Sequence, residues 1–151
     1  MTESASQAHP LDPLVDRPLP GGGWAFGPHE SWLLHDAVGS TPEQAAHPIM
    51  AFLAAQRGLG LTVAELFALF GTDMADGPLL TESTLELHTD LHPDVSYEVR
   101  GTVVSAVRKS GRTLGVFDLV TARFDVLEPD ATVPAATVTN VYALPRAGDQ
   151  P

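Results

Sequence analysis

The residues whose types best suit chemistry in this sequence are a histidine and an aspartate that precede an apolar stretch. His47 stands directly before Pro48 and a run of apolar residues. An imidazole titrates near neutral pH, so His47 can act as a general acid or base where a partner group orients it. Asp36 is a carboxylate that could orient His47 across the intervening loop. The alternative is that His47 only begins a helix, bonded to backbone, and that Asp36 lies on a solvated face.

Cations gather at one place, where Arg108, Lys109 and Arg112 surround a predicted hairpin turn. Guanidinium groups bind phosphate well, so this cluster could contact the phosphates of a ligand. The alternative is a charged hairpin tip that meets only water. A phosphate-binding loop is not expected at residues 21–23, because tryptophan follows the three glycines and no Lys-Ser or Lys-Thr pair does.

The composition limits the classes of partner. The sequence has 151 residues, no cysteine and a formal net charge of -11 at pH 7. The absence of cysteine excludes disulfides and thiolate zinc sites and fits a reducing cytoplasm. The negative charge opposes non-specific binding to nucleic acid and anionic membranes, and neither a membrane span nor a signal peptide is recognisable. We expect no cofactor and no metal, because Glu82, Glu86 and His88 share one strand face with nothing to complete a ligand set.

The first part of the sequence predicts an extended arm and two helical segments. Residues 1–23 contain four prolines and three consecutive glycines, which favour an extended arm. Residues 28–38 predict a helix that ends at Gly39, with a strand as the alternative. Residues 41–44 predict a further helical turn before His47. The predicted inner face of the 28–38 helix consists of Trp32, Leu33, Leu34 and Ala37.

The element on which the predicted domain is built is an apolar helix over residues 46–60. Pro48 suits its first turn, because the N–H that proline lacks would be unsatisfied there. Apolar residues cover nearly every side, which is typical of a buried helix. They are Ile49, Met50, Phe52, Leu53, Leu59 and three alanines. A capping box at residues 62–65 predicts a second, short helix.

From residue 79 onward, apolar and polar residues alternate with a period of two, which predicts four half-buried antiparallel strands. The turns fall at residues 91–94, 109–112 and 128–131, and because the connections are short we expect the strands to pair sequentially as a meander. Long strands curve through sheet twist. The prediction is an α+β domain over residues 24–146, in which a curved antiparallel sheet wraps the long central apolar helix, followed by a loose tail at 147–151.

A buried helix followed by a long four-stranded meander resembles the hotdog fold, and more closely the MaoC-like dehydratases and R-specific enoyl-CoA hydratases. The helix mouth, Ala-His-Pro-Ile-Met-Ala at 46–51, is similar to the family's Ala-His-Gly-Met. Residues 91–101, 108–112 and 115–121 look like the family's central strand, its hairpin and the following strand. The resemblance implies an acyl thioester on coenzyme A or a carrier protein as ligand, and dehydration of a 3-hydroxyacyl group or the reverse reaction.

The resemblance also implies a dimer, either of this chain or with another hotdog subunit, with the site between subunits. His47 would be the general acid or base and Asp36 the residue that orients it. N–H groups of the helix N-terminus would stabilise the thioester enolate. The residues implied in substrate binding are Pro48, Ile49, Met50, Arg108, Lys109 and Arg112.

Two features differ from the family pattern. The family's Asp-x-Asn-Pro-x-His segment, which supplies its acid–base pair, has no counterpart at residues 36–43, and Pro48 replaces a glycine whose N–H would polarise the thioester carbonyl. The helix entry is also similar to that of FabZ-type dehydratases, which carry a carboxylate inside the helix, but none occurs between Pro48 and Gly60. Three interpretations stay open: a hydro-lyase, a non-catalytic partner subunit of a heteromeric dehydratase, and a thioesterase.

Overall fold

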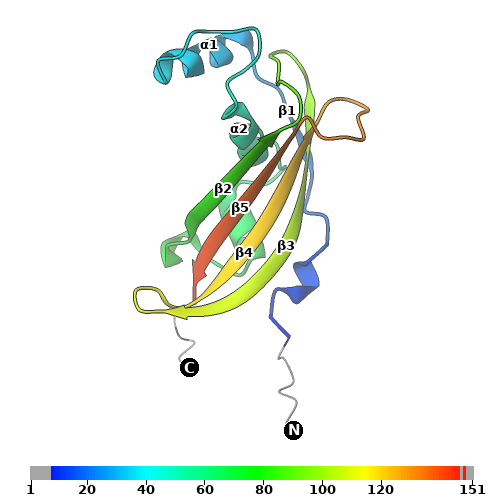
Figure 1. Cartoon of the computed structure of the whole chain (residues 1–151). Helices are drawn as coiled ribbons and strands as arrows, with labels where there is room; N and C mark the ends of the chain where they lie inside the picture. The colour runs from blue at the N-terminus through cyan, green and yellow to red at the C-terminus, as the bar shows by residue number, and fades with distance from the viewer. Residues whose placement is uncertain (1–7, 147, 149–151) are drawn as a thin grey trace.

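A computed structural model describes residues 8–146 and residue 148, and Figure 1 shows how its elements are arranged. The predicted tail therefore lies outside the described residues apart from Gly148, as does the beginning of the predicted arm. The elements are η1 (Asp12–Leu14), β1 (Gly22–Trp24), α1 (Pro28–Ala37), α2 (Met50–Arg57), α3 (Val63–Leu69), η2 (Met74–Asp76), β2 (Leu79–Leu87), β3 (Tyr97–Gly111), β4 (Gly115–Leu127) and β5 (Ala136–Pro145).

All five strands form one antiparallel sheet in the order β1-β3-β4-β5-β2. The predicted meander is correct for β3, β4 and β5 but wrong for β2, which pairs with β5 at the far edge. The reason lies in the connection between β2 and β3, which does not turn back as a hairpin. Its Leu91 is buried and accepts a hydrogen bond from the N–H of Ala46, and the N–H of Asp94 donates to Phe26. These bonds hold the connection against the segments that enter α1 and α2.

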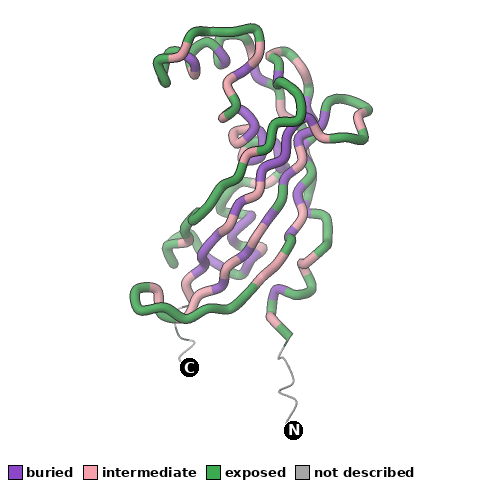
Figure 2. Tube along the Cα trace, viewed as in Figure 1, coloured by how far each residue is buried: buried purple, intermediate pink, exposed green. Residues whose placement is uncertain are grey.

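The core lies between the sheet and α2. Small residues of α2, Ala51, Ala54 and Ala55, are almost fully buried and bring the helix close to the strands. The predicted helix is confirmed but has eight residues and ends at Gly58. It is not buried on every side, because Phe52 and Leu53 are only half-buried. Figure 2 shows burial concentrated along β4 and β5 and under the helices.

The predicted inner face of α1 is wrong for three of its four residues, whereas the fourth, Leu34, is half-buried and packs against the core. Trp32 and Leu33 are 49% and 45% exposed, Ala37 is exposed as well, and the residues that α1 buries are Ser31 and His35. The physical reason is the position of α1, which projects beyond the end of the sheet and faces the loop before α2 (Figure 1). The helical turn predicted at residues 41–44 is also absent, since this loop has no regular structure there.

A buried carboxylate ties distant segments together. Asp118 of β4 is 1% exposed and accepts hydrogen bonds from Nε of Arg108 at 2.9 Å and Nε of Arg146 at 2.7 Å. Nε2 of His9, in the N-terminal arm, lies 2.9 Å from the same carboxylate. Burial opposes the ionised form, but these hydrogen bonds outweigh it and lower the pKa of Asp118 well below its usual value.

We expect Asp118→Asn to lower the free energy of unfolding by about 3 kcal/mol near neutral pH, because it leaves two arginines without their buried counterion. A carboxylate whose pKa is lower in the folded than in the unfolded state stabilises above its unfolded pKa. The difference between wild type and variant should therefore shrink as the pH falls below about 4. Urea unfolding over a pH series measures it, with the exposed Asp90→Asn as control. A constant difference at all pH values would contradict this assignment.

The glycine run at the start of β1 has a packing role. A Cβ on Gly22 would lie 2.6 Å from the carbonyl oxygen of Gly58 and 2.9 Å from the nitrogen of Gly60, whereas a Cβ on Gly23 would meet its nearest atom at 3.4 Å. The chain thus passes the end of α2 at a distance that only glycine permits at position 22.

Gly22→Ala should therefore cost about 1–3 kcal/mol of stability through overpacking. Gly23→Ala, in the same strand, is the matched control and should leave the melting temperature unchanged or slightly raised. Equal melting temperatures for the two variants would show that this close approach does not contribute to the stability of the protein.

Candidate functional site

His47 stands at the mouth of α2 and is half-buried. Its Nδ1 accepts a hydrogen bond from the N–H of Ile49 at 3.2 Å, which places the proton of the neutral ring on Nε2. The ring lies edge-on to that of His35, with 5.7 Å between the ring centroids and an angle of 79° between the planes. Two imidazoles from different elements therefore meet at this mouth.

His35 is the residue of this site that the sequence did not single out. It is 5% exposed, its Nδ1 lies 2.7 Å from Oγ of Ser40, and its Nε2 lies 3.4 Å from the carbonyl oxygen of Ala45. These contacts fix the ring between α1 and the loop that leads to His47. The sequence contains only a weak indication that His35 is buried. Ser31 and His35 lie on one face of α1, but because neither residue is apolar, this face does not have the pattern of one that packs against a core.

Asp36 lies beside His35 in the chain but on a different side of α1, and it is exposed. Among the described residues it has no hydrogen bond or ion pair with His47. The orienting role of Asp36 stays a prediction, while the side chain that the structure brings against His47 is His35.

The backbone N–H groups at the mouth are already used. The N–H of Ile49 donates to the His47 ring, that of Met50 to the carbonyl of His47 at 2.9 Å, and that of Ala51 to the carbonyl of Pro48 at 3.1 Å. Pro48 has no N–H to offer. Stabilisation of a thioester enolate by N–H groups at this mouth stays a prediction, and in the described structure these donors are occupied by a tight turn through Pro48 and Ile49.

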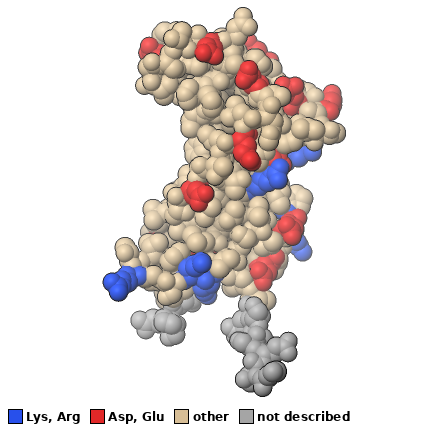
Figure 3. Space-filling view, viewed as in Figure 1, with Lys and Arg blue, Asp and Glu red and all other residues tan. Residues whose placement is uncertain are grey.

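The three basic candidates lie at the other end of the molecule. Lys109 and Arg112 are exposed at the β3–β4 hairpin, while Arg108 binds Asp118. Figure 1 places this hairpin far from α1, and Figure 3 shows Lys and Arg only over the middle and lower part of the visible face, whereas Asp and Glu cover the upper part and also lie among the basic side chains below. Within one chain, the basic cluster and the mouth of α2 are not brought together.

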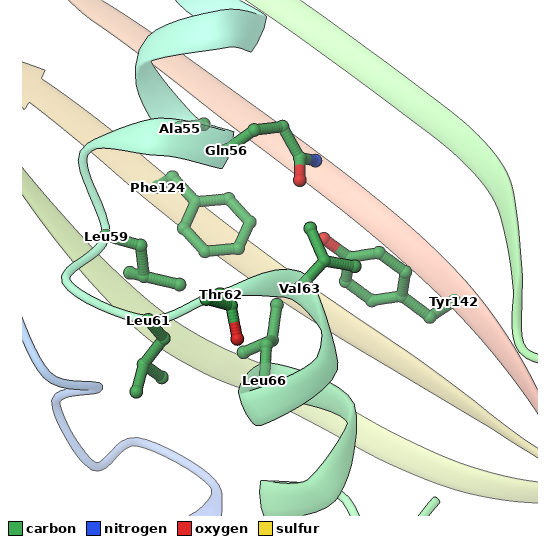
Figure 4. Close-up of a pocket in the computed structure, with 9 residues that line it drawn as sticks. All are labelled: Ala55, Gln56, Leu59, Leu61, Thr62, Val63, Leu66, Phe124 and Tyr142. Atoms are coloured by element: carbon green, nitrogen blue, oxygen red, sulfur yellow. The ribbon is translucent and has the colours of Figure 1, made fainter. Parts of the chain in front are cut away.

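In the described part of the chain, three of the hollows lie beside the helices and concern this site. The first, here called the α1–α2 cleft, is lined by Trp24, Glu30, Leu33, Leu34, Ala37, Met50, Leu53 and Arg57. The second lies beside His35 and is lined by Pro28, Ser31, Trp32, Pro42, Glu43, Gln44 and Pro93 as well. The third is a small cavity between the end of α2, α3 and the sheet (Figure 4).

A chain of polar side chains reaches the small cavity of Figure 4 through the core. Oγ of Ser83 donates to Oδ1 of Asn140 at 2.7 Å, and Nδ2 of Asn140 donates to the hydroxyl of Tyr142 at 3.0 Å. Tyr142 also hydrogen-bonds to the side chain of Gln56, which points toward it from α2 (Figure 4). Burial raises the pKa of Tyr142, so the hydroxyl stays neutral. The chain satisfies the polar groups that β5 buries.

We expect Tyr142→Phe to destabilise the protein by about 1–3 kcal/mol, because it leaves buried amide groups without a partner. The aromatic ring that packs against Phe67 and Phe70 is kept in this variant. Asn140→Ala and the double variant complete a thermodynamic cycle measured by urea unfolding. Their effects should be non-additive by at least about 0.5 kcal/mol, and additivity would contradict the coupling.

Metal binding finds no support among the described side chains, where no group of three His, Asp or Glu residues is placed to hold an ion. None of the described helices is long and apolar enough to cross a membrane.

Comparison with known proteins identifies the fold. No family model matches the sequence, and no curated protein is similar to it at the sequence level. The ChsH1-ChsH2 complex from Mycobacterium tuberculosis is similar in structure, with a TM-score of 0.64, 15% identity and coverage of 87% of this chain and 86% of that chain. The C-terminally truncated HadBC (3R-hydroxyacyl-ACP dehydratase) complex from the same organism has a TM-score of 0.60 and 12% identity, with 85% and 99% covered.

An (R)-hydratase from A. caviae involved in PHA biosynthesis has a TM-score of 0.53 and 14% identity, with 93% of this chain and 100% of that chain covered. These likenesses confirm the predicted α+β class and the hotdog fold. At such low identity they describe the fold and leave the activity to be argued from the site.

Proposed function

We propose that this chain is an acyl-thioester-binding subunit of a heteromeric hydratase or dehydratase of the hotdog fold, and that a second hotdog chain supplies the acid–base pair. Addition of water to an enoyl thioester needs a base for the water, a proton for the adjacent carbon and donors for the developing oxyanion. The fold is shared with an (R)-hydratase and with two complexes whose names each join two proteins.

The observation that carries this proposal is the state of the mouth of α2. The N–H groups of Ile49, Met50 and Ala51 are occupied, Pro48 has none, and no described carboxylate hydrogen-bonds to either His35 or His47. Within the described residues, neither an oxyanion hole nor an acid–base pair of histidine and carboxylate is therefore assembled at this mouth. What it offers a thioester is an apolar surface beside the mouth and one imidazole edge.

A hydro-lyase that works without a partner is the second candidate, and the contact between His35 and His47 is the observation that favours it. Two adjacent imidazoles can divide the roles of acid and base, with Nε2 of His47 carrying the proton to be transferred. In that case Asp36 or Glu43 would supply negative charge to the histidine pair after movement of the loop.

The test compares the purified chain with the native assembly isolated from its source cells and identified by native mass spectrometry. We expect the assembly to contain a second hotdog chain and to hydrate a crotonyl thioester, while the chain alone stays at the uncatalysed rate. His29→Ala, on the exposed side of α1, is the matched control for His47→Ala. Turnover by the chain alone, abolished by His47→Ala but kept in His29→Ala at an unchanged melting temperature, would establish the second candidate instead.

A further inference from the structure

The α1–α2 cleft is formed by facing stripes of two helices that do not close on each other. Glu30, Leu33, Leu34 and Ala37 recur at the spacing that places residues on one face of α1. Met50, Leu53 and Arg57 do the same on α2. Two apolar helical stripes normally pack at a distance of 8–10 Å between axes. Here α1 has no extensive contact with any other described helix or strand, and the space between the stripes stays open.

The cleft begins at the candidate site. Met50, the first residue of α2, lines the cleft, and its N–H donates to the carbonyl oxygen of His47. Trp24 of β1 also lines the cleft, and the centroid of its ring lies 5.3 Å from that of Phe26. A ligand whose reactive group is at the mouth of α2 can therefore extend its chain into this cleft along the helix.

The cleft ends at charged side chains. Arg57 occupies the last turn of α2, and Glu30 lies in the first turn of α1, where it accepts a hydrogen bond from the N–H of Gly27. Met50 and Arg57 are seven residues apart, so the apolar path along α2 is about 10 Å long at a rise of about 1.5 Å per residue. An extended hydrocarbon chain advances about 1.25 Å per carbon for tetrahedral bonds of about 1.5 Å, so about eight carbons fit before the charged end.

We propose that the α1–α2 cleft binds the acyl chain of a medium-chain thioester, with α1 as its outer wall and Arg57 as the residue that limits the chain length. The proposal rests on the proposed function, since it takes the thioester to lie at the mouth of α2. Apolar walls favour each methylene group that leaves water, and the desolvation of Arg57 opposes methylene groups beyond the end of the cleft.

The fluorescence of a native tryptophan can report the binding of a ligand in this cleft. It has two tryptophans, of which Trp24 lines the cleft and Trp32 does not. In a Trp32→Phe variant, titration with acyl-CoAs of four to twelve carbons should shift the emission of Trp24 to the blue. Affinity should rise about fourfold for each added methylene up to about eight carbons and then level off.

Two substitutions with matched controls test the walls of the cleft in this background. Arg57→Leu should extend the rise in affinity to ten or twelve carbons, whereas Arg17→Leu, which removes an exposed arginine of the N-terminal arm, should not. Ala37→Phe should weaken the binding of both octanoyl-CoA and butyryl-CoA at least tenfold, because Ala37 lies in the last turn of α1, at the end of the cleft opposite Glu30. Val133→Phe adds the same ring to a loop residue that is 71% exposed and should change neither affinity.

The outcomes separate this proposal from the one on which it rests. Binding of acyl-CoAs with an affinity independent of chain length, or an unchanged length limit in Arg57→Leu, would overturn the cleft and leave the proposed function standing. No binding of any acyl-CoA, by the chain alone or in its native assembly, would overturn both.

Discussion

The close approach of α2 to the sheet is the constraint on which the rest of the structure depends. Three alanines face the strands, and a Cβ on Gly58 would lie 2.5 Å from a methyl group of Val99. A Cβ on Gly101 would in turn lie 2.8 Å from Leu59. Residues without bulk at these points let one short helix fill the concave side of the sheet. A larger side chain at any of these positions would push α2 away from the sheet and would displace the mouth of α2, which includes His47.

This close packing explains why the mouth of α2 looks as it does. The helix begins at Met50, and directly before it Pro48 and Ile49 form a tight turn rather than a regular first helical turn. The turn consumes the N–H groups that a helix start usually leaves free. The same geometry places His47 against His35, because α1 and its loop have no sheet beneath them and pack around the mouth instead.

The basic hairpin and the apolar cleft lie at different ends of the described structure. The basic hairpin and the mouth of α2 lie at opposite ends, so a phosphate at one and a thioester at the other cannot belong to a single compact ligand bound to one copy. The buried cluster around Asp118 uses two of the eight lysine and arginine residues, which gives Arg108 and Arg146 an architectural role. What remains beside the mouth is an apolar cleft between two helices, which suits the uncharged part of a ligand.

The sequence by itself determined those features that depend on neighbours in the chain. The capping box of α3 is present as predicted, with the side chain of Thr62 accepting from the N–H of Glu65, and the long strands follow the alternation of apolar residues. Helix caps, turns and alternation act within a few residues, so a single sequence contains the information.

Only the tertiary structure decided which distant segments meet. It paired β2 with β5, turned α1 so that His35 and not Trp32 is buried, and closed the donors at the mouth of α2. Each of these outcomes is set by packing and hydrogen bonds between residues far apart in the chain, where local preference is weak and tertiary contacts are strong. The hotdog fold was therefore predictable from the sequence, whereas the state of its candidate site was not.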